Sequence, residues 1–279
     1  MKKRIVLLLT LLLFGAFATQ TQAGYVVRKI YETGSDGQPL TGTAVTNLTL
    51  NSVFPDGFTQ TQELTEFFDA PVDFADNYGS FVQGYFEPPQ TGDYVFWIAS
   101  DDNSQLWLST DANPENKKLI ASVGDWTSEN EWTKFSSQKS EKITLERGKK
   151  YYFEVLHKEG TGGDNLSVGW QLPDGTLERP MPAYYLAPYF PAGTAVSIKT
   201  QPQDIYATEN DSVVFFVSVD GAQPISYQWY KNGQPIAGET LSYLKLSKVQ
   251  LTDNGNTYYV KVNNTLQSDT ATLFVSADV

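Results

Sequence analysis

Two adjacent aspartates, Asp101 and Asp102, have the chemistry and spacing to hold a metal ion. They separate two apolar segments, 95–99 and 106–108, whose aromatic and aliphatic residues are typical of buried β-strands. Neighbouring side chains on a regular strand point to opposite faces, so both carboxylates reach one cation only through an unusual backbone, such as a cis peptide bond. A calcium ion, which takes roughly six to eight oxygen ligands, would account for that arrangement. A solvated acidic turn is the alternative.

A second acidic loop, residues 159–165, combines two acids with several glycines. Glycine lets a backbone fold tightly and turn its carbonyls inward, and calcium sites mix carbonyl with carboxylate ligands. The loop lacks the spacing of an EF-hand, and no Gly-Lys-Ser/Thr follows it to bind phosphate. It is therefore either part of a calcium site or a glycine-rich hairpin tip.

The absence of cysteine and the scarcity of histidine exclude several kinds of site. The chain has no cysteine and one histidine, His157, which excludes zinc–thiolate sites, iron–sulfur clusters, cysteine nucleophiles and multi-histidine sites. A serine triad would have to use His157, and no Gly-x-Ser-x-Gly motif accompanies it. We expect His157 to pack at the end of a strand near the glycine-rich loop.

The N-terminal residues and the charge indicate an extracellular protein. Met1-Lys-Lys-Arg4, an apolar run and Thr21-Gln-Ala23 predict a secretory signal peptide at residues 1–23. The apolar run is too short to span a bilayer comfortably, so we expect a secreted, extracellular or cell-surface protein without membrane insertion. The net charge of −12 argues against nucleic acid and anionic lipid as partners.

Short apolar segments separated by turn residues predict an all-β protein of two domains. Residues 24–187 form the larger domain, residues 188–195 a proline-containing linker, and residues 196–279 a smaller domain. Trp126 and Trp132 lie in a polar, loop-like segment of the larger domain. They either pack on its surface, which we favour, or serve as ligand platforms.

Three separated motifs in the larger domain carry a resemblance to a known family. They are the segments 84–108 (GYFEPPQTGDYVFWIASDDNSQLWL), 149–166 (KKYYFEVLHKEGTGGDNL) and 173–175 (PDG). In this order they resemble the PA14 domain family, whose fold is a β-sandwich. Members occur in bacterial toxins, yeast flocculins and adhesins, and as accessory modules of glycosidases. Not every member binds sugar, so fold analogy alone does not settle function.

The resemblance implies a set of ligands. Sugar-binding PA14 domains hold calcium with an Asp-Asp pair joined by a cis peptide, and the ion binds sugar hydroxyls. Here the implied metal ligands are the side chains of Asp101, Asp102 and Glu159 and the carbonyls near Thr161 and Gly163. Flocculin-type members carry an asparagine where this chain has Glu159, and the added charge should tighten calcium binding.

A further prediction concerns the residues that would contact a sugar. The three acids named as metal ligands are candidates, and Asp164 and Trp126 are the further carbohydrate-binding candidates.

Residues 196–279 resemble an immunoglobulin-like domain that lacks the disulfide. Trp229 stands where that family has its core tryptophan, and Val217 and Val260 stand where it has the two cysteines. Tyr258 follows Asp253-x-Gly255 with one extra residue and is similar to the tyrosine corner of that fold. Nothing in this domain marks a site, so we interpret it as a spacer or docking module.

These observations favour a secreted, non-catalytic carbohydrate-binding protein in which Ca²⁺ held by the Asp-Asp pair coordinates the hydroxyls of a glycan or polysaccharide. The alternative is an extracellular adhesion or matrix protein with a structural Ca²⁺ and other cell-surface proteins as partners. We do not expect an enzyme. A glycosidase needs two carboxylates across a cleft, and both domains resemble binding or structural families, which leaves no segment for a catalytic domain.

Overall fold

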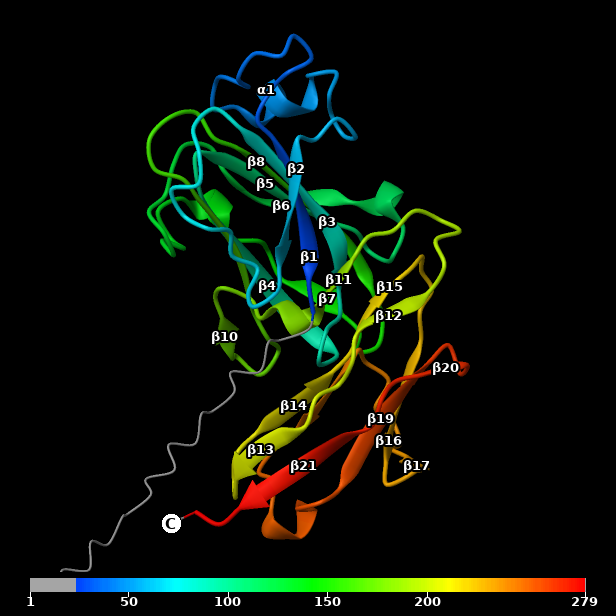
Figure 1. Cartoon of the computed structure of the whole chain (residues 1–279). Helices are drawn as coiled ribbons and strands as arrows, with labels where there is room; N and C mark the ends of the chain where they lie inside the picture. The colour runs from blue at the N-terminus through cyan, green and yellow to red at the C-terminus, as the bar shows by residue number, and fades with distance from the viewer. Residues whose placement is uncertain (1–23, 279) are drawn as a thin grey trace, which may run out of the picture.

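The computed structural model describes residues 24–278, and the predicted signal peptide at residues 1–23 lies outside them. The described chain is nearly all β-structure, as predicted, and is arranged as two β-sandwiches (Figure 1). Within residues 24–278, no helix has the length and apolar character needed to cross a membrane.

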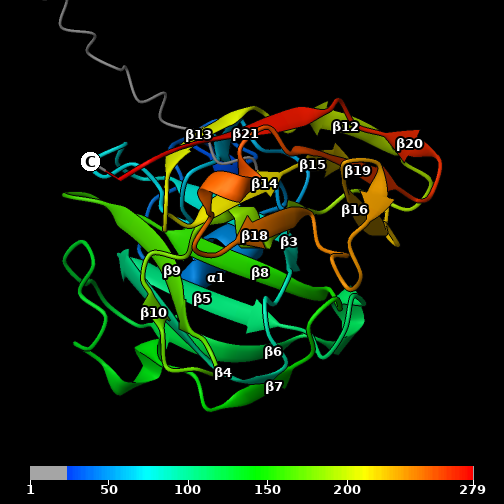
Figure 2. The same ribbon diagram turned by 90° about the horizontal axis from the view of Figure 1, so that it is seen from below.

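Two sheets face each other in the larger domain (Figure 2). The first follows the order β2 (Gln60–Leu64), β1 (Val26–Tyr31), β3 (Gly79–Phe86), β8 (Tyr151–Lys158), β5 (Asn103–Leu108) and β6 (Lys118–Val123), with β11 (Leu186–Pro188) paired to β3. The second follows the order β10 (Leu177–Glu178), β9 (Asn165–Gln171), β4 (Gly92–Asp101) and β7 (Ile143–Leu145). The short 3₁₀ turns η1 (Pro114–Asn116), η2 (Ser136–Gln138) and η3 (Ala183–Tyr185) lie between strands.

Strand β4 shows why the sequence forms this sandwich. Its side chains alternate between two faces, so Phe96 and Ile98 belong to the core between the sheets. Val95 and Trp97 point to the other face, where Trp132 covers them. The strands expected at residues 95–99 and 106–108 are therefore confirmed within β4 and β5.

A five-residue helix, α1 (Val45–Thr49), is an element that the sequence did not predict. It buries Val45 and Leu48 against a small cluster that includes Phe81 and Leu156. One and a half turns are too short to show helical periodicity, and this tertiary packing stabilises them instead.

The smaller domain is an immunoglobulin-like sandwich. Its strands are β12 (Ser197–Thr200), β13 (Ile205–Thr208), β14 (Val213–Phe216), β15 (Ser218–Asp220), β16 (Tyr227–Lys231), β17 (Gln234–Pro235), β18 (Tyr243–Leu246), β19 (Thr257–Val262), β20 (Leu266–Gln267) and β21 (Ala271–Ser276), with η4 (Leu251–Asp253) before β19. Trp229, Val217 and Val260 share its core, so apolar contact replaces the disulfide. Tyr258 is buried, but its hydroxyl finds no hydrogen-bond partner among residues 24–278, and the bond that defines a tyrosine corner is missing.

The two sandwiches share part of their cores, because Phe216, Leu241 and Tyr243 of the smaller domain join the core of the larger one. Tyr243 of the smaller domain packs against Tyr184 and Tyr185 of the larger one, with ring centroids 5.2 and 5.4 Å apart. Tyr189, in the predicted linker, packs on Tyr85. The segment between the domains is therefore fixed by contacts on the larger domain.

A buried ion pair lies at the same interface. Glu87 is 2% exposed, and its Oε1 lies 2.7 Å from the Nζ atom of Lys150. Its Oε2 accepts hydrogen bonds from the backbone N–H and the hydroxyl of Ser242, at 3.2 and 2.6 Å. One carboxylate thus joins β-structure from both domains.

Candidate metal and carbohydrate site

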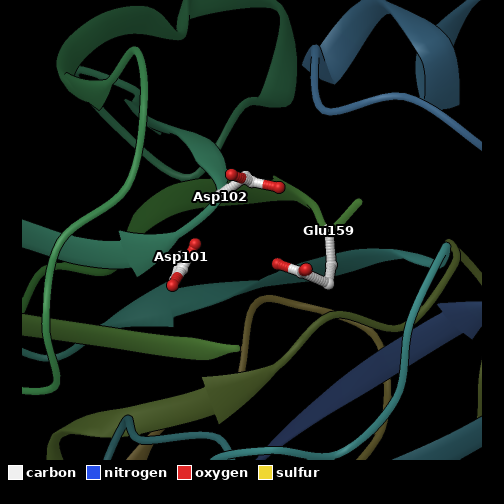
Figure 3. Close-up of side chains that lie close together, drawn as sticks. All are labelled: Asp101, Asp102 and Glu159. Carbon is white, nitrogen blue, oxygen red and sulfur yellow. The ribbon is translucent and has the colours of Figure 1, made fainter. Parts of the chain in front are cut away.

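Three carboxylates meet at the end of the larger sandwich where β4 passes into β5. Asp101 ends β4, Asp102 separates it from β5, and Glu159 follows β8. Oxygen atoms of the three side chains all lie within 4.8 Å of one another. Figure 3 shows the Glu159 carboxylate pointing toward the two aspartates. The peptide bond between Asp101 and Asp102 is cis, as the sequence suggested.

Hydrogen bonds fix the aspartate pair from both sides. The buried hydroxyl of Ser100 donates to the Asp102 carbonyl oxygen at 2.6 Å. The Oδ2 atom of Asp102 accepts the backbone N–H of Gly160 at 2.9 Å. A Cβ atom on Gly160 would lie 2.9 Å from Cγ2 of Thr43 and 3.1 Å from that same carboxylate oxygen. A larger residue would therefore have to displace these side-chain atoms, and the Gly160 hydrogen bond puts the two acidic loops in direct contact.

His157 packs against the backbone of the aspartate pair, near the glycine-rich loop as predicted. It is fully buried, and its Nε2 atom lies 2.7 Å from the carbonyl oxygen of Asp101. Burial, together with the charges of Arg28 and Lys158, lowers its pKa to about 3. The ring is therefore neutral at physiological pH. Because a carbonyl can only accept, Nε2 carries the proton and Nδ1 accepts from Ser80 at 3.3 Å.

Two acids of the cluster, Glu159 and Asp101, have raised pKa values. Burial, and then the charges of Asp102 and Asp101, raise the pKa of Glu159 to about 8. Burial and Asp102 raise the pKa of Asp101 to about 6. Lys158 is a buried cation beside the cluster. Its ammonium donates to the Glu159 carbonyl, and burial lowers its pKa to about 8. Negative charge gathered here is therefore poorly compensated by the protein.

The oxygens of this cluster fit a calcium ion. Glu159 is fully buried, yet neither of its carboxylate oxygens has a hydrogen-bond partner in the described chain. Buried polar atoms are almost always paired, so these two oxygens indicate a ligand. Hard carboxylate oxygens from three side chains are the donors that calcium prefers.

Asp164, another predicted site residue, interacts electrostatically with the cluster. It is 3% exposed, and its charge acts on both Asp101 and Glu159. Its Oδ2 accepts the backbone N–H of Ala75 at 2.9 Å. Thr161 and Gly163 are exposed in the same loop, and their proposed roles as carbonyl ligands stay predictions.

Comparison with known families identifies both domains. The model of the PA14 domain matches residues 26–182, more than half of the chain. The chain belongs to the PA14 domain family. The model of the immunoglobulin I-set domain matches residues 196–276, as the resemblance to an immunoglobulin-like domain predicted.

Curated relatives share only a short part of their length with this PA14 protein. Over 100 residues it is 46% identical to the Mus musculus N-acetyl-beta-glucosaminyl-glycoprotein 4-beta-N-acetylgalactosaminyltransferase 1, covering 34% of this chain and 10% of the transferase. Over 112 residues it is 30% identical to Mus musculus fibrocystin, covering 38% of this chain and 3% of fibrocystin. The chain thus spans a tenth or less of these two proteins.

Two solved structures are similar to different parts of the chain. The epithelial adhesin 9 A domain of Candida glabrata, in complex with Galb1-4GlcNAc, is 16% identical with a TM-score of 0.40, over 58% of this chain and 87% of that one. The titin M3 domain is 27% identical with a TM-score of 0.26, over 30% of this chain and 98% of that one.

The two tryptophans of the PA14 domain lie in different surroundings. Trp132 is 9% exposed and packs with Trp97, as favoured. Trp126 is 46% exposed, and the Nζ atom of Lys134 lies 3.1 Å from the centroid of its ring. Trp126 precedes Thr127, whose hydroxyl accepts the N–H of Ser100 at 3.0 Å, so its loop is attached beside the aspartate pair.

Sequence reasoning missed a third loop of the PA14 domain, residues 73–77, that supports the site. The N–H of Asn77 donates to the Gly160 carbonyl at 2.5 Å, and the N–H of Gly162 donates to Oδ1 of Asp76 at 3.0 Å. Asp73 and Asn77 both have positive φ angles, a conformation that asparagine and aspartate adopt more readily than most residues. The dense Asp/Asn content of this segment was the available signal.

Proposed function

We propose that this protein is an extracellular, non-catalytic carbohydrate-binding protein whose PA14 domain binds sugar through calcium. The observation that carries the proposal is the cluster of Asp101, Asp102 and Glu159, with the buried carboxylate of Glu159 left unpaired. Membership of the PA14 family supports it, because sugar-binding members use an Asp-Asp pair in this way.

The side chains have separate roles in this proposal. Asp101, Asp102 and Glu159 would hold Ca²⁺, with the carbonyls near Thr161 and Gly163 as further ligands. The ion would supply open coordination positions for sugar hydroxyls. Asp164, as a further acceptor, and the exposed ring of Trp126 would contact the sugar beside the ion.

The position of the cluster suits a binding module. Strand β8 has eight residues and runs from the interface between the domains to Lys158; at about 3.3 Å per residue, the cluster lies roughly 25 Å from that interface. The immunoglobulin-like domain would then hold the site away from whatever it is attached to.

The alternative is an adhesion or matrix protein in which calcium is structural and the partner is another protein. The shared core of the two domains favours it, because a fixed pair of domains suits a mechanical connection. Binding to a glycan array in calcium distinguishes the two: an array without signal, together with a higher Tm on adding calcium, supports this alternative.

Isothermal titration with candidate oligosaccharides, chosen from the array, tests the main proposal. Chelation of calcium should abolish sugar binding, and so should Asp101→Asn combined with Asp102→Asn. Glu115→Gln, an exposed charge change on η1 at the opposite end of β5, is the matched control and should bind normally. Equal sugar binding with and without chelator contradicts the proposed mechanism.

The tryptophans provide a second pair of variants. Trp126→Ala should weaken sugar binding by about fivefold and leave calcium affinity unchanged, because stacking on an aromatic ring contributes on the order of 1 kcal/mol. Trp132→Ala should lower the Tm through lost packing. Unchanged sugar affinity in Trp126→Ala removes that residue from the proposed sugar site.

A further inference from the structure

Asn165, the last residue of the glycine-rich loop, has a buried side-chain amide. It is the first residue of β9 and is 5% exposed. Its Nδ2 donates to the carbonyl oxygen of Thr127 at 2.8 Å. Its Oδ1 has no hydrogen-bond partner within the part of the chain that the structure describes.

The orientation of the amide follows from its one hydrogen bond. The Thr127 carbonyl can only accept, so the amide must turn its NH₂ group toward it. The oxygen is therefore held as a free acceptor. Buried acceptors of this kind nearly always have a partner. The missing partner of this oxygen is therefore a cation or a hydrogen-bond donor.

The strand pairing puts this amide next to the acidic cluster. Asn165 is the register partner of Asp101 in the antiparallel pair of β9 and β4. Leu166 and Val168 of β9 point into the core, so Asn165 points to the other face, as Asp101 does. Directly opposed residues on one face of such a pair have Cβ atoms about 4.5–5.5 Å apart.

We infer that the Oδ1 atom of Asn165 is an additional ligand of the cation held by Asp101, Asp102 and Glu159. This inference rests on the proposed function and extends its ligand set to β9. A neutral amide oxygen is a common calcium ligand. This oxygen would add a metal ligand without adding negative charge to a cluster in which carboxylates already repel one another.

Two substitutions separate the oxygen from the nitrogen. Asn165→Ala removes both the oxygen and the hydrogen bond to Thr127. Asn165→Asp keeps an oxygen and removes only the NH₂ donor. If the amide serves as a ligand, Asn165→Ala lowers calcium affinity by about tenfold or more, whereas Asn165→Asp binds calcium as tightly as the wild type or tighter. If the amide only anchors the Thr127 loop, both variants lose affinity alike.

Terbium luminescence gives a second readout that an anchoring role would not change. Tb³⁺ replaces calcium in oxygen sites, and its lifetimes in H₂O and D₂O count the water molecules bound to it. Asn165→Ala should bind Tb³⁺ with one more water than the wild type, because a water fills the vacated position. Asn165→Asp should keep the wild-type count, and Glu115→Gln serves again as the control.

The outcomes distinguish this inference from the function beneath it. A wild-type protein that binds neither Ca²⁺ nor Tb³⁺ overturns both. A wild type that binds both ions, with an unchanged water count in Asn165→Ala and equal losses of affinity in the two variants, overturns the role of Asn165 alone. If Asn165→Ala does not fold, Asn165→Leu, which keeps the size of the side chain and also lacks the oxygen, takes its place in both readouts.

Discussion

The Nε2–H group of His157 donates a hydrogen bond of 2.7 Å to the backbone carbonyl oxygen of Asp101. The sole histidine of the chain thus acts on the backbone of the aspartate pair, from a fully buried position in which it stays neutral. It supports the Asp101 backbone and does not titrate at physiological pH.

Replacing this donor should weaken calcium binding. His157→Leu leaves the Asp101 carbonyl without its partner, and we expect calcium affinity to fall by about tenfold, as is typical for groups that orient metal ligands. His157→Gln, which keeps an N–H donor, should lose less. Calcium titration calorimetry measures both. Wild-type affinity in His157→Leu would show that the hydrogen bond does not position the pair.

The raised pKa of Glu159 predicts how the stability of the calcium-free protein depends on pH. The folded state keeps the Glu159 proton up to about pH 8, whereas the unfolded chain releases it near its ordinary value of 4.5. Between pH 6.5 and 8 the folded state therefore binds more protons, so the free energy of unfolding should fall as pH rises. Two groups oppose this trend at the ends of the range, because the unfolded chain holds their protons better: His157 near pH 6.5 and Lys158 near pH 8. We therefore expect the fall in stability mainly below about pH 7.5.

Urea unfolding in chelator at several pH values measures this slope. Glu159→Gln should flatten it, since that side chain no longer titrates. Calcium should also remove the slope, because the ion displaces the proton and keeps the carboxylate ionised. Stability of the chelated wild type that rises from pH 6.5 to 8 would contradict the account.

The close contact at Gly160 predicts a steric effect and its relief. Gly160→Ala places a methyl group 2.9 Å from Cγ2 of Thr43 and 3.1 Å from Oδ2 of Asp102, which should displace the loop and weaken calcium binding. Thr43→Ser removes the Cγ2 atom, so the double variant should recover part of the affinity. Gly124→Ala, whose methyl group meets nothing within 4 Å, is the control. Additive losses in the double variant would refute the steric explanation.

The buried ion pair at the domain interface predicts that the two domains unfold together, because its Glu87 also accepts hydrogen bonds from Ser242 of the smaller domain. Glu87→Gln leaves the Lys150 ammonium without a counter-charge, and breaking a buried pair in this way costs about 3–5 kcal/mol. Glu146→Gln breaks an exposed pair with Lys149, whose side chains are 55% and 60% exposed, and should cost about 0–1 kcal/mol. We expect one cooperative transition in differential scanning calorimetry, shifted down in Glu87→Gln. Two separate transitions in the wild type would show that the shared core does not couple the domains.

Local patterns in the sequence were sufficient for the strands and for the aspartate pair. The continuous apolar and aromatic run at residues 95–99 identified β4 as a buried strand, because both of its faces are covered. Val217 and Val260 were recognised as substitutes for cysteines, since Trp229 fixed their place in the fold.

Long-range contacts account for what the sequence did not reveal. The segment 73–77 looks like an ordinary polar loop, and only the folded chain brings Asn77 to Gly160. Asn165 lies inside a motif that was recognised, yet its role depends on which way its amide turns. Tyr243 belongs to a strand of the smaller domain, yet it packs on Tyr184 of the larger one. No local pattern records such pairings.

The central claim is that the oxygens of Asp101, Asp102 and Glu159 hold a calcium ion that takes a ligand from solvent. Anomalous diffraction from crystals grown with calcium tests it most directly. We expect one strong anomalous peak about 2.3–2.6 Å from oxygens of all three side chains, with at least one coordination position open to solvent. A map without a peak there, or with the Lys158 ammonium among the carboxylates in its place, would contradict it.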